Sequence, residues 1–172
     1  MKFQRQLKYY YLRFIRLRGE PRELALGMAL GIFSGMMPIL PFQTALAVAL
    51  AIFFKVSKIT AALGTWVSNP FNWYFLYYYS YKLGAFILGT PEKSPVFSSV
   101  MTSIRSGEES MVILREILGA GGIFVSTFLL GGLVMGFVVA TPSYLLLLYI
   151  FKHIRTWRRA RKGHRNRRLQ EQ

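Results

Sequence analysis

Polar side chains inside the longest apolar stretches are the residues of this sequence whose types suit binding chemistry. They form two clusters beside prolines, Gln43 and Thr44 in one, and Thr65, Ser68, Asn69 and Asn72 in the other. A polar group among apolar residues costs free energy unless it is paired or used. We expect the clusters to face each other and hold an anion such as a phosphate, with side-chain amides and free helix-end amides as donors. The alternative is that Gln43 and Asn69 only bind carbonyl groups that the prolines leave without a partner.

Two lysines, Lys55 and Lys58, lie between these clusters in the sequence. An ammonium group attracts an anionic head group, so we count both lysines among the candidate binding residues. They also form a short basic loop between two apolar runs, and a role in setting the membrane topology is the alternative.

Few residues of this sequence are of the types that act in catalysis. The chain contains no Cys and no Asp, and its two histidines, His153 and His164, lie in the basic C-terminal segment. The usual acid–base, nucleophilic and metal-binding constellations are therefore missing. We expect no catalytic residue, no metal and no cofactor. A lipid-modifying enzyme, the alternative, would need Gln43, Asn69 or Glu23 for turnover.

Three uncharged runs must position the candidate residues: 24–54, 59–81 and 117–151. A bilayer core about 30 Å thick is crossed by about 20 apolar residues, so runs of this length predict membrane segments. The whole chain has 172 residues, of which 53% are apolar and 17% are charged, with a net charge of +15. This composition favours a membrane protein with basic ends over an ordinary soluble domain.

Four prolines are expected to interrupt these segments: Pro38, Pro41, Pro70 and Pro142. A proline lacks an amide hydrogen and frees the carbonyl group four residues earlier. Inside a membrane such a break is tolerated only within protein or beside a watery cavity. We therefore predict an all-α membrane protein with two to three hydrophobic helical segments and proline-broken or re-entrant hairpins.

Small residues spaced four apart precede two of the prolines: Gly27, Gly31 and Gly35 in the first run, and Gly132, Gly136 and Ala140 in the last. Such a stripe lets two membrane helices approach closely, and we predict helix packing there. Because both series lead into a proline, a weak internal repeat of the transporter kind is the alternative.

Both ends of the chain are basic, with seven Lys or Arg before Leu24 and nine after Phe151, which places both termini in the cytoplasm. The expected order is a basic amphipathic interfacial helix (1–22), one helical membrane domain (23–151) and a basic cytoplasmic tail (152–172). Within the domain we expect a re-entrant hairpin (24–54), a crossing (59–90), an external amphipathic loop (91–118) and a returning segment (119–151). The loop should hold two short helices broken near Gly107, with the apolar positions Val96, Val100 and Ile104, then Met111, Leu114 and Leu118.

Aromatic residues are dense between positions 66 and 81, where Trp and Tyr predominate. Such residues are typical of an interfacial belt. A lining for an isoprenoid or acyl chain is the alternative.

Three segments carry a family resemblance: GIFSG at 31–35, PILPFQT at 38–44, and GTWVSNP at 64–70, followed by Tyr-rich sequence and Gly84. Over roughly residues 10 to 155 the chain resembles the bacterial membrane family catalogued as domain of unknown function 2062. It departs from many relatives at Pro41, where they have glycine. The resemblance implies a place in the inner membrane and, in some relatives, fusion to soluble enzymes such as glycosyltransferases. It supplies no activity and no catalytic residues.

Two functions follow from these features. The first is binding or translocation of a lipid-linked or amphiphilic anion, such as a polyprenyl-phosphate, through a cavity lined by broken helices. The second is a non-catalytic anchor or scaffold for a partner envelope enzyme. Partners should be anionic membrane lipids and further copies of the chain, because two spans and a hairpin offer few walls for a pathway. The basic tail follows an apolar run directly, so we expect head groups, and not nucleic acid, as its counter-charge.

Overall fold

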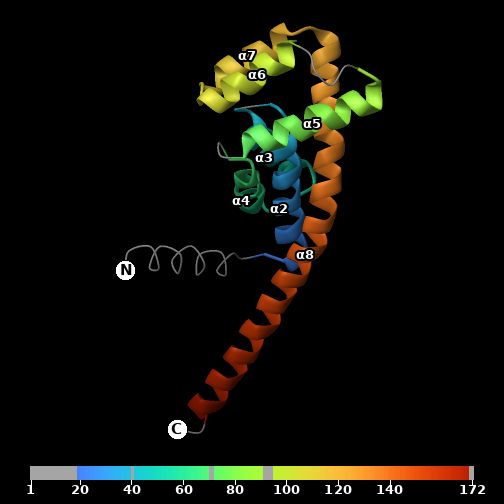
Figure 1. The fold of residues 1–172 in the computed structure, drawn as a ribbon. Coiled ribbons are helices and arrows are strands. Elements are labelled where there is room, and N and C mark those ends of the chain that lie inside the picture. Colours follow the sequence, from blue (N-terminus) through green and yellow to red (C-terminus); the bar gives the residue numbers. More distant parts are fainter. Residues whose placement is uncertain (1–18, 40, 70–71, 91–94, 171–172) are drawn as a thin grey trace.

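Every regular element in the described part of the protein is a helix, as the sequence predicts. The computed structural model describes residues 19–39, 41–69, 72–90 and 95–170, with side chains up to residue 157 (Figure 1). The interfacial helix expected over 1–22 falls almost wholly outside these ranges, and so does Pro70. The elements are α2 (Pro21–Met36), α3 (Gln43–Phe53), α4 (Lys58–Gly64), the 3₁₀ helix η1 (Thr65–Val67), α5 (Trp73–Leu88), α6 (Pro95–Ser106), α7 (Ser110–Gly119) and α8 (Gly122–Gln170).

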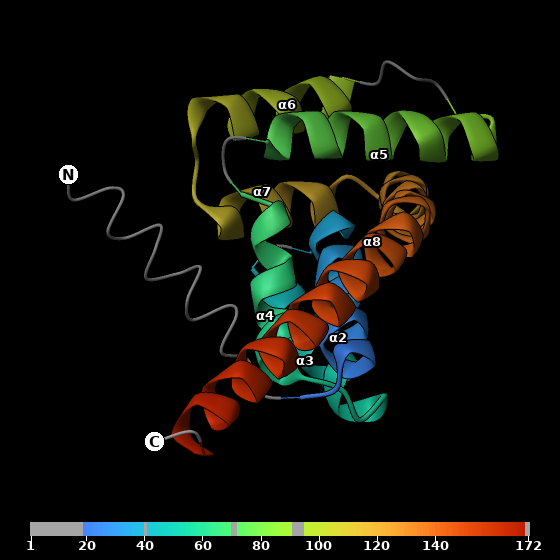
Figure 2. The ribbon, with the colours of Figure 1, turned by 90° about the horizontal axis from the view of Figure 1, so that it is seen from below.

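Helix α8 is the axis on which the other elements assemble. Its 49 residues make a helix about 74 Å long. Helix α2 runs beside it and also packs on α3 and α4, whereas α5 crosses it at a large angle (Figures 1 and 2). The pair α6 and α7 lies beyond α5, near the start of α8. The last part of α8 projects away from this body as an arm (Figure 1).

The first apolar run is divided at its prolines, because α2 ends at Met36 and α3 begins at Gln43. Pro38 and Pro41 both lie in the connection. The carbonyl groups that these prolines would free are occupied by turn amides: Met37 N donates to Ser34 O at 3.1 Å, and Ile39 N donates to Met37 O at 2.9 Å. The side chain of Gln43 is therefore not needed to satisfy them.

The second run is also divided, and no single helix covers the crossing expected over 59–90. Helix α4, η1 and α5 follow one another there, and α4 and α5 are only about 10 and 24 Å long, less than a bilayer core of about 30 Å. Within the described residues, one helix is long and apolar enough to cross a membrane, Gly122–Trp157 in α8. The expected count of two crossings is thus unconfirmed.

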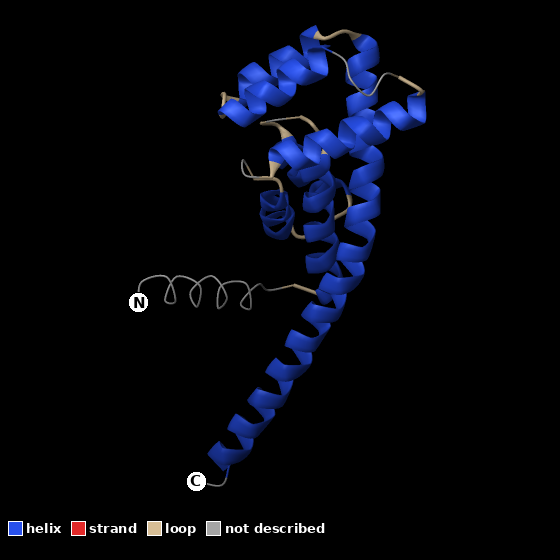
Figure 3. Cartoon of the chain, in the orientation of Figure 1, coloured by secondary structure: helices blue, strands red, loops and turns tan. Residues whose placement is uncertain are grey.

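The interruption expected at Pro142 is wrong, because α8 continues through it (Figure 3). Pro142 is exposed, so its ring displaces no neighbouring helix. Beside it, the Thr141 hydroxyl donates to Phe137 O at 2.8 Å. Packing against α2 holds the helix, so the missing amide bond is tolerated and α8 curves without ending.

The break expected near Gly107 is confirmed: α6 and α7 form a hairpin, and Gly107 has a φ of +76°. This left-handed conformation favours glycine. Helix α6 buries Val100 and Ile104, as its periodicity predicts. Two residues of the apolar stripe expected on α7 are exposed instead. Met111 is 44% exposed and Leu118 60%. Helix α7 has apolar residues on two sides, and the side that meets the core carries Ile113 and Ile117.

The glycines of α2 lie where this helix meets α4. A Cβ at Gly31 would lie 2.0 Å from the carbonyl oxygen of Ala61, and one at Gly64 would lie 2.3 Å from that of Met28. A Cβ at Gly27 would lie 2.3 Å from the Thr60 hydroxyl oxygen. Backbone therefore packs directly on backbone here, which only glycine allows.

Glycines also bring helix α8 close to its neighbours in two places, at α5 and at α2. Where it crosses α5, a Cβ at Gly131 would lie 1.7 Å from the carbonyl oxygen of Ser80, and Gly84 faces Thr127 in the same way at 1.8 Å. Gly132 and Gly136 meet the α2 region, with Cβ positions 2.8 Å from Pro38 Cδ and Phe33 Cδ2 respectively.

An aromatic cluster joins α5, α6 and α8 and sets the distance between them. Tyr81 of α5 stacks on Phe97 of α6, with ring centroids 4.2 Å apart, and lies 5.8 Å from Phe128 of α8. Phe128 also meets Tyr77 edge-on at 5.7 Å. Such contacts are worth about 0.5–1.5 kcal/mol each beyond their buried area. They fix α6 alongside α5.

Candidate functional site

The two polar clusters meet at the junction of α2, α3 and η1, which we call the polar junction. The hydroxyl oxygens of Thr44 and Thr65 lie 3.2 Å apart. Ser34, Gln43 and Ser68 are buried nearby, and within the described residues Ser34 Oγ, Gln43 Oε1 and Ser68 Oγ have no hydrogen-bond partner. Ser68 packs beside Gly35 of α2. Buried polar atoms of this kind ordinarily have a partner, so the junction is a polar spot inside an apolar body.

The amides of Asn69 and Asn72 are used within their own turn. Asn69 N donates to Asn72 Oδ1 at 3.0 Å, and Asn72 N donates to Asn69 Oδ1 at 3.2 Å. Asn72 Nδ2 donates to Val67 O at 2.7 Å. These bonds close the turn before α5, as short polar side chains commonly do. These bonds show that both residues hold the helix break.

The lysines lie at the wrong end of the hairpin for the predicted entrance. Gln43 is the first residue of α3, and Lys55 follows its end, so a helix about 16 Å long separates them. Lys58 begins α4, which runs back toward Thr65. Both lysines are exposed. Among the described residues, the two lysines that we expected at the entrance therefore lie away from Gln43.

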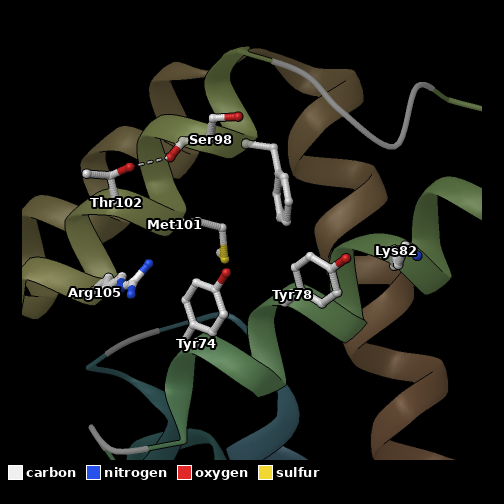
Figure 4. Close-up of a pocket in the computed structure, with 8 residues that line it drawn as sticks. Tyr74, Tyr78, Lys82, Ser98, Met101, Thr102 and Arg105 are labelled. Carbon is white, nitrogen blue, oxygen red and sulfur yellow. Dashed lines mark hydrogen bonds between the residues drawn. The ribbon is translucent and has the colours of Figure 1, made fainter.

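A pocket with cations lies elsewhere, between α5 and α6 (Figure 4). Its volume is about 490 Å³, within the range of small-molecule sites. Its walls are Tyr74, Tyr78 and Lys82 from α5, and Phe97, Ser98, Met101, Thr102 and Arg105 from α6. The spacings of three and four residues put each set on one face of its helix. We call this the α5–α6 pocket.

The pocket has a cation at each end, with aromatic rings, a methionine and hydroxyl groups between them. Tyr74 and Tyr78 point from α5 toward α6, with Arg105 beyond Tyr74 and Lys82 beyond Tyr78 (Figure 4). Lys82 Nζ lies 5.8 Å from the centroid of the Tyr78 ring, within reach of a cation–π interaction. Arg105 forms no ion pair with any acidic residue of the described ranges. Its guanidinium is free to bind a carboxylate or phosphate with two parallel hydrogen bonds.

Hydroxyl groups add further polar contacts along the pocket. The Thr102 hydroxyl donates to Ser98 O at 2.8 Å, which leaves its oxygen lone pairs able to accept (Figure 4). Tyr74 and Tyr78 each carry a phenol group that donates or accepts. Two cations, hydroxyl groups and an apolar centre can bind the head of an amphiphilic anion.

Sequence reasoning missed this pocket, although each half left a signal. Tyr74, Tyr78 and Lys82 recur every four residues, but the aromatic density led us to predict an interfacial belt. Arg105 lies in the loop that we predicted to be external. The residue spacing predicts the polar face of each helix separately. Only the tertiary contact between α5 and α6 shows that the two faces line one pocket.

Comparison with known proteins gives a family and nothing finer. The model of a family described as an uncharacterized protein conserved in bacteria, DUF2062, matches residues 4–160. No curated protein and no solved structure matches the chain. The match spans most of the sequence and confirms the resemblance seen in its Gly-, Pro- and Asn-containing segments, so the chain belongs to the bacterial DUF2062 family.

Proposed function

We propose that this protein is an integral protein of the bacterial inner membrane that binds an amphiphilic anion in the α5–α6 pocket. The observation that carries the proposal is the placement of Arg105 and Lys82 at opposite ends of a pocket walled by Tyr74, Tyr78 and Met101. The ligand is the amphiphilic anion that the sequence predicts, but the proposed site is this pocket and not the polar junction.

The exposed surface supports a place in the membrane. In α8 the side chains of Leu145, Leu146 and Tyr149 are 61–71% exposed, and on the body Phe53 and Phe86 are 78% and 81% exposed. Soluble monomers rarely expose apolar surface on this scale, whereas lipid chains cover it without cost. The basic residues after Phe151 favour a cytoplasmic C-terminus.

The pocket suits binding better than turnover. The eight described residues that line it include neither a carboxylate nor an imidazole, the groups that most often transfer protons in hydrolysis. They include two cations, which stabilise a phosphate by direct charge-assisted hydrogen bonds. A membrane supplies amphiphilic phosphates in the form of anionic lipids and polyprenyl-phosphates.

The first prediction concerns Arg105→Gln. Full-length protein in nanodiscs is titrated with a polyprenyl-phosphate and with phosphatidylglycerol, using zwitterionic phosphatidylcholine as the negative ligand. Loss of a charge-assisted hydrogen bond of about 1.5–3 kcal/mol should weaken binding of both anions about 10- to 100-fold. The matched control is Arg115→Gln, because Arg115 is exposed on α7 and does not line the pocket. Equal binding by the two variants would overturn the proposal.

The anchor function remains the second candidate because of the arm of α8. Beyond Phe151 the residues Lys152, His153 and Arg155 are exposed, and the helix continues away from the body (Figure 1). A projecting basic helix can hold a partner enzyme without any ligand. A chain that binds no anion, yet loses a cross-linked envelope enzyme when the arm is removed, would favour this function.

A further inference from the structure

A second hollow adjoins the α5–α6 pocket on the other side of Lys82. It has a volume of about 350 Å³, and among the described residues that line it Lys82 alone is charged. The remaining walls are Tyr79, Leu83 and Phe86 from α5 and Met135 from α8. We call it the α5–α8 groove. Because Lys82 also lines the α5–α6 pocket, the two hollows share a side chain and meet across α5.

The two hollows differ in chemistry. The α5–α6 pocket has Arg105, Ser98 and Thr102 on its α6 side, whereas the walls of the α5–α8 groove other than Lys82 are aromatic or aliphatic, apart from one phenol oxygen. The stem of a lysine packs on apolar surface while its ammonium group reaches the polar side. Lys82 therefore stands at the boundary between a polar and an apolar compartment.

We infer that the pocket and the groove form one site for an anionic lipid, with the head between Arg105 and Lys82 and the hydrocarbon chain in the α5–α8 groove. This inference rests on the proposed function and names the ligand class, a phosphate or carboxylate that carries a hydrocarbon chain. A free phosphate would use only the first half of the site.

Two features favour a lipid chain over a protein segment in the groove. Met135 belongs to the Gly122–Trp157 stretch of α8, the candidate membrane span, so the groove opens where lipid chains are available. A second copy of the chain is a poor occupant, since it carries 22 basic residues against seven acidic ones and would bring mainly positive charge to Lys82 and Arg105.

The groove wall is suited to a flexible chain. Met135 is unbranched and adapts its shape to what it contacts. Its sulfur accepts a hydrogen bond from the Ser80 hydroxyl at 3.5 Å, which anchors the side chain to α5. Phe86 is 81% exposed, so its ring is available to cover a bound chain.

The test compares two probes on the full chain in zwitterionic nanodiscs: inorganic phosphate and decyl phosphate. Decyl phosphate should bind at least tenfold more tightly, because its chain buries apolar area in the groove. Phe86→Ala should reduce that advantage several-fold and leave the binding of inorganic phosphate unchanged. Phe53→Ala is the matched control, because Phe53 is 78% exposed at the end of α3 and lines neither hollow.

The possible outcomes distinguish a failure of the lipid assignment from a failure of the proposed anion binding. Equal affinity for the two probes, with both lost in Arg105→Gln, would keep the anion site and overturn the lipid assignment. Equal effects of Phe86→Ala and Phe53→Ala would also overturn it. Absence of binding by either probe would overturn the proposed function as well. A decyl phosphate analogue with a photoreactive chain end gives a second readout, since it should label the peptides containing Phe86 or Met135.

Discussion

Tyr77 shows what burial costs a single residue. Its side chain is fully buried between α5 and α8, and within the described residues its hydroxyl group has no hydrogen-bond partner. An unsatisfied buried hydroxyl group costs about 1–3 kcal/mol, whereas the ring beneath it keeps its contact with Phe128. The oxygen therefore works against the stability that the ring provides.

We predict that Tyr77→Phe raises the free energy of unfolding by about 1 kcal/mol, because it removes the unpaired oxygen and keeps the ring. Thermal unfolding of the purified protein in one detergent measures the change. Ser126→Ala, at an exposed position, serves as the control and should shift the midpoint little. A lower melting temperature for Tyr77→Phe would mean that a bound water or ligand satisfies the hydroxyl group.

Single residues also show how far the candidate site could be predicted. The polar residues Thr44 and Thr65 do meet, which their proline neighbours suggested. The roles of Asn69 and Asn72 were not predictable, because the same amide can close a turn or bind a ligand and only geometry separates the two. Lys55 was misplaced because nearness in sequence is not nearness in space once a helix intervenes.

At the scale of elements, the glycines at the points where helices cross determine how closely those helices pack. The crossing of α5 and α8 depends on Gly84 and Gly131, which lie against the carbonyl groups of Thr127 and Ser80. A side chain at either position must push two helices apart, since a carbonyl group in a helix cannot move aside. The aromatic cluster and the α5–α6 pocket would move with α5.

We predict that Gly131→Ala destabilises the fold by about 1–3 kcal/mol or more, because its Cβ would lie 1.7 Å from the Ser80 oxygen. Gly119→Ala is the control: nothing lies within 4 Å of its Cβ position in α7, and alanine should there stabilise the helix by up to about 1 kcal/mol. Chemical unfolding in mixed micelles measures both variants. A neutral Gly131→Ala would contradict the close crossing.

Elements differ in how well the sequence predicts them. The α6–α7 hairpin was predictable because a glycine with positive φ separates two periodic stretches. The division of the run 59–81 was less predictable. The Asn-Pro pair marks a break, but it does not indicate how short α4 is. The break predicted at Pro142 is wrong because the effect of a proline depends on the elements that pack around it, and α2 packs along α8.

At the scale of the whole molecule, α8 relates the body to the bilayer. The Gly122–Trp157 stretch has 36 residues and is about 54 Å long, so it spans a bilayer core of about 30 Å with length to spare. If it crosses, α6 and α7 lie toward one side of the membrane and the basic arm toward the other. Composition predicts a membrane protein, but only the assembled chain shows that Lys82 and Arg105 line the same pocket.

The absence of native cysteine allows a direct test of this arrangement. Single cysteines at Ser106, Leu146 and Thr156 are labelled with a membrane-impermeant maleimide in sealed vesicles of both orientations. We predict that positions 106 and 156 react from opposite sides, because α8 crosses between them. Position 146 should react only after denaturation, since Leu146 faces lipid. Labelling of 106 and 156 from the same side would contradict the crossing.

The order of synthesis follows from the position of α8 after the other described helices. Helices α2 and α5 both pack on an element that the ribosome makes after them. The glycine contacts of α2 with α4 need only the chain up to Gly64, so that pair can assemble early. The contact of α2 with Gly132 must wait for about 70 further residues, which takes roughly 3–14 s at about 5–20 residues per second. During that interval the α8-facing sides of α2 and α5 are uncovered, so the nascent chain exposes most apolar surface just before α8 is made.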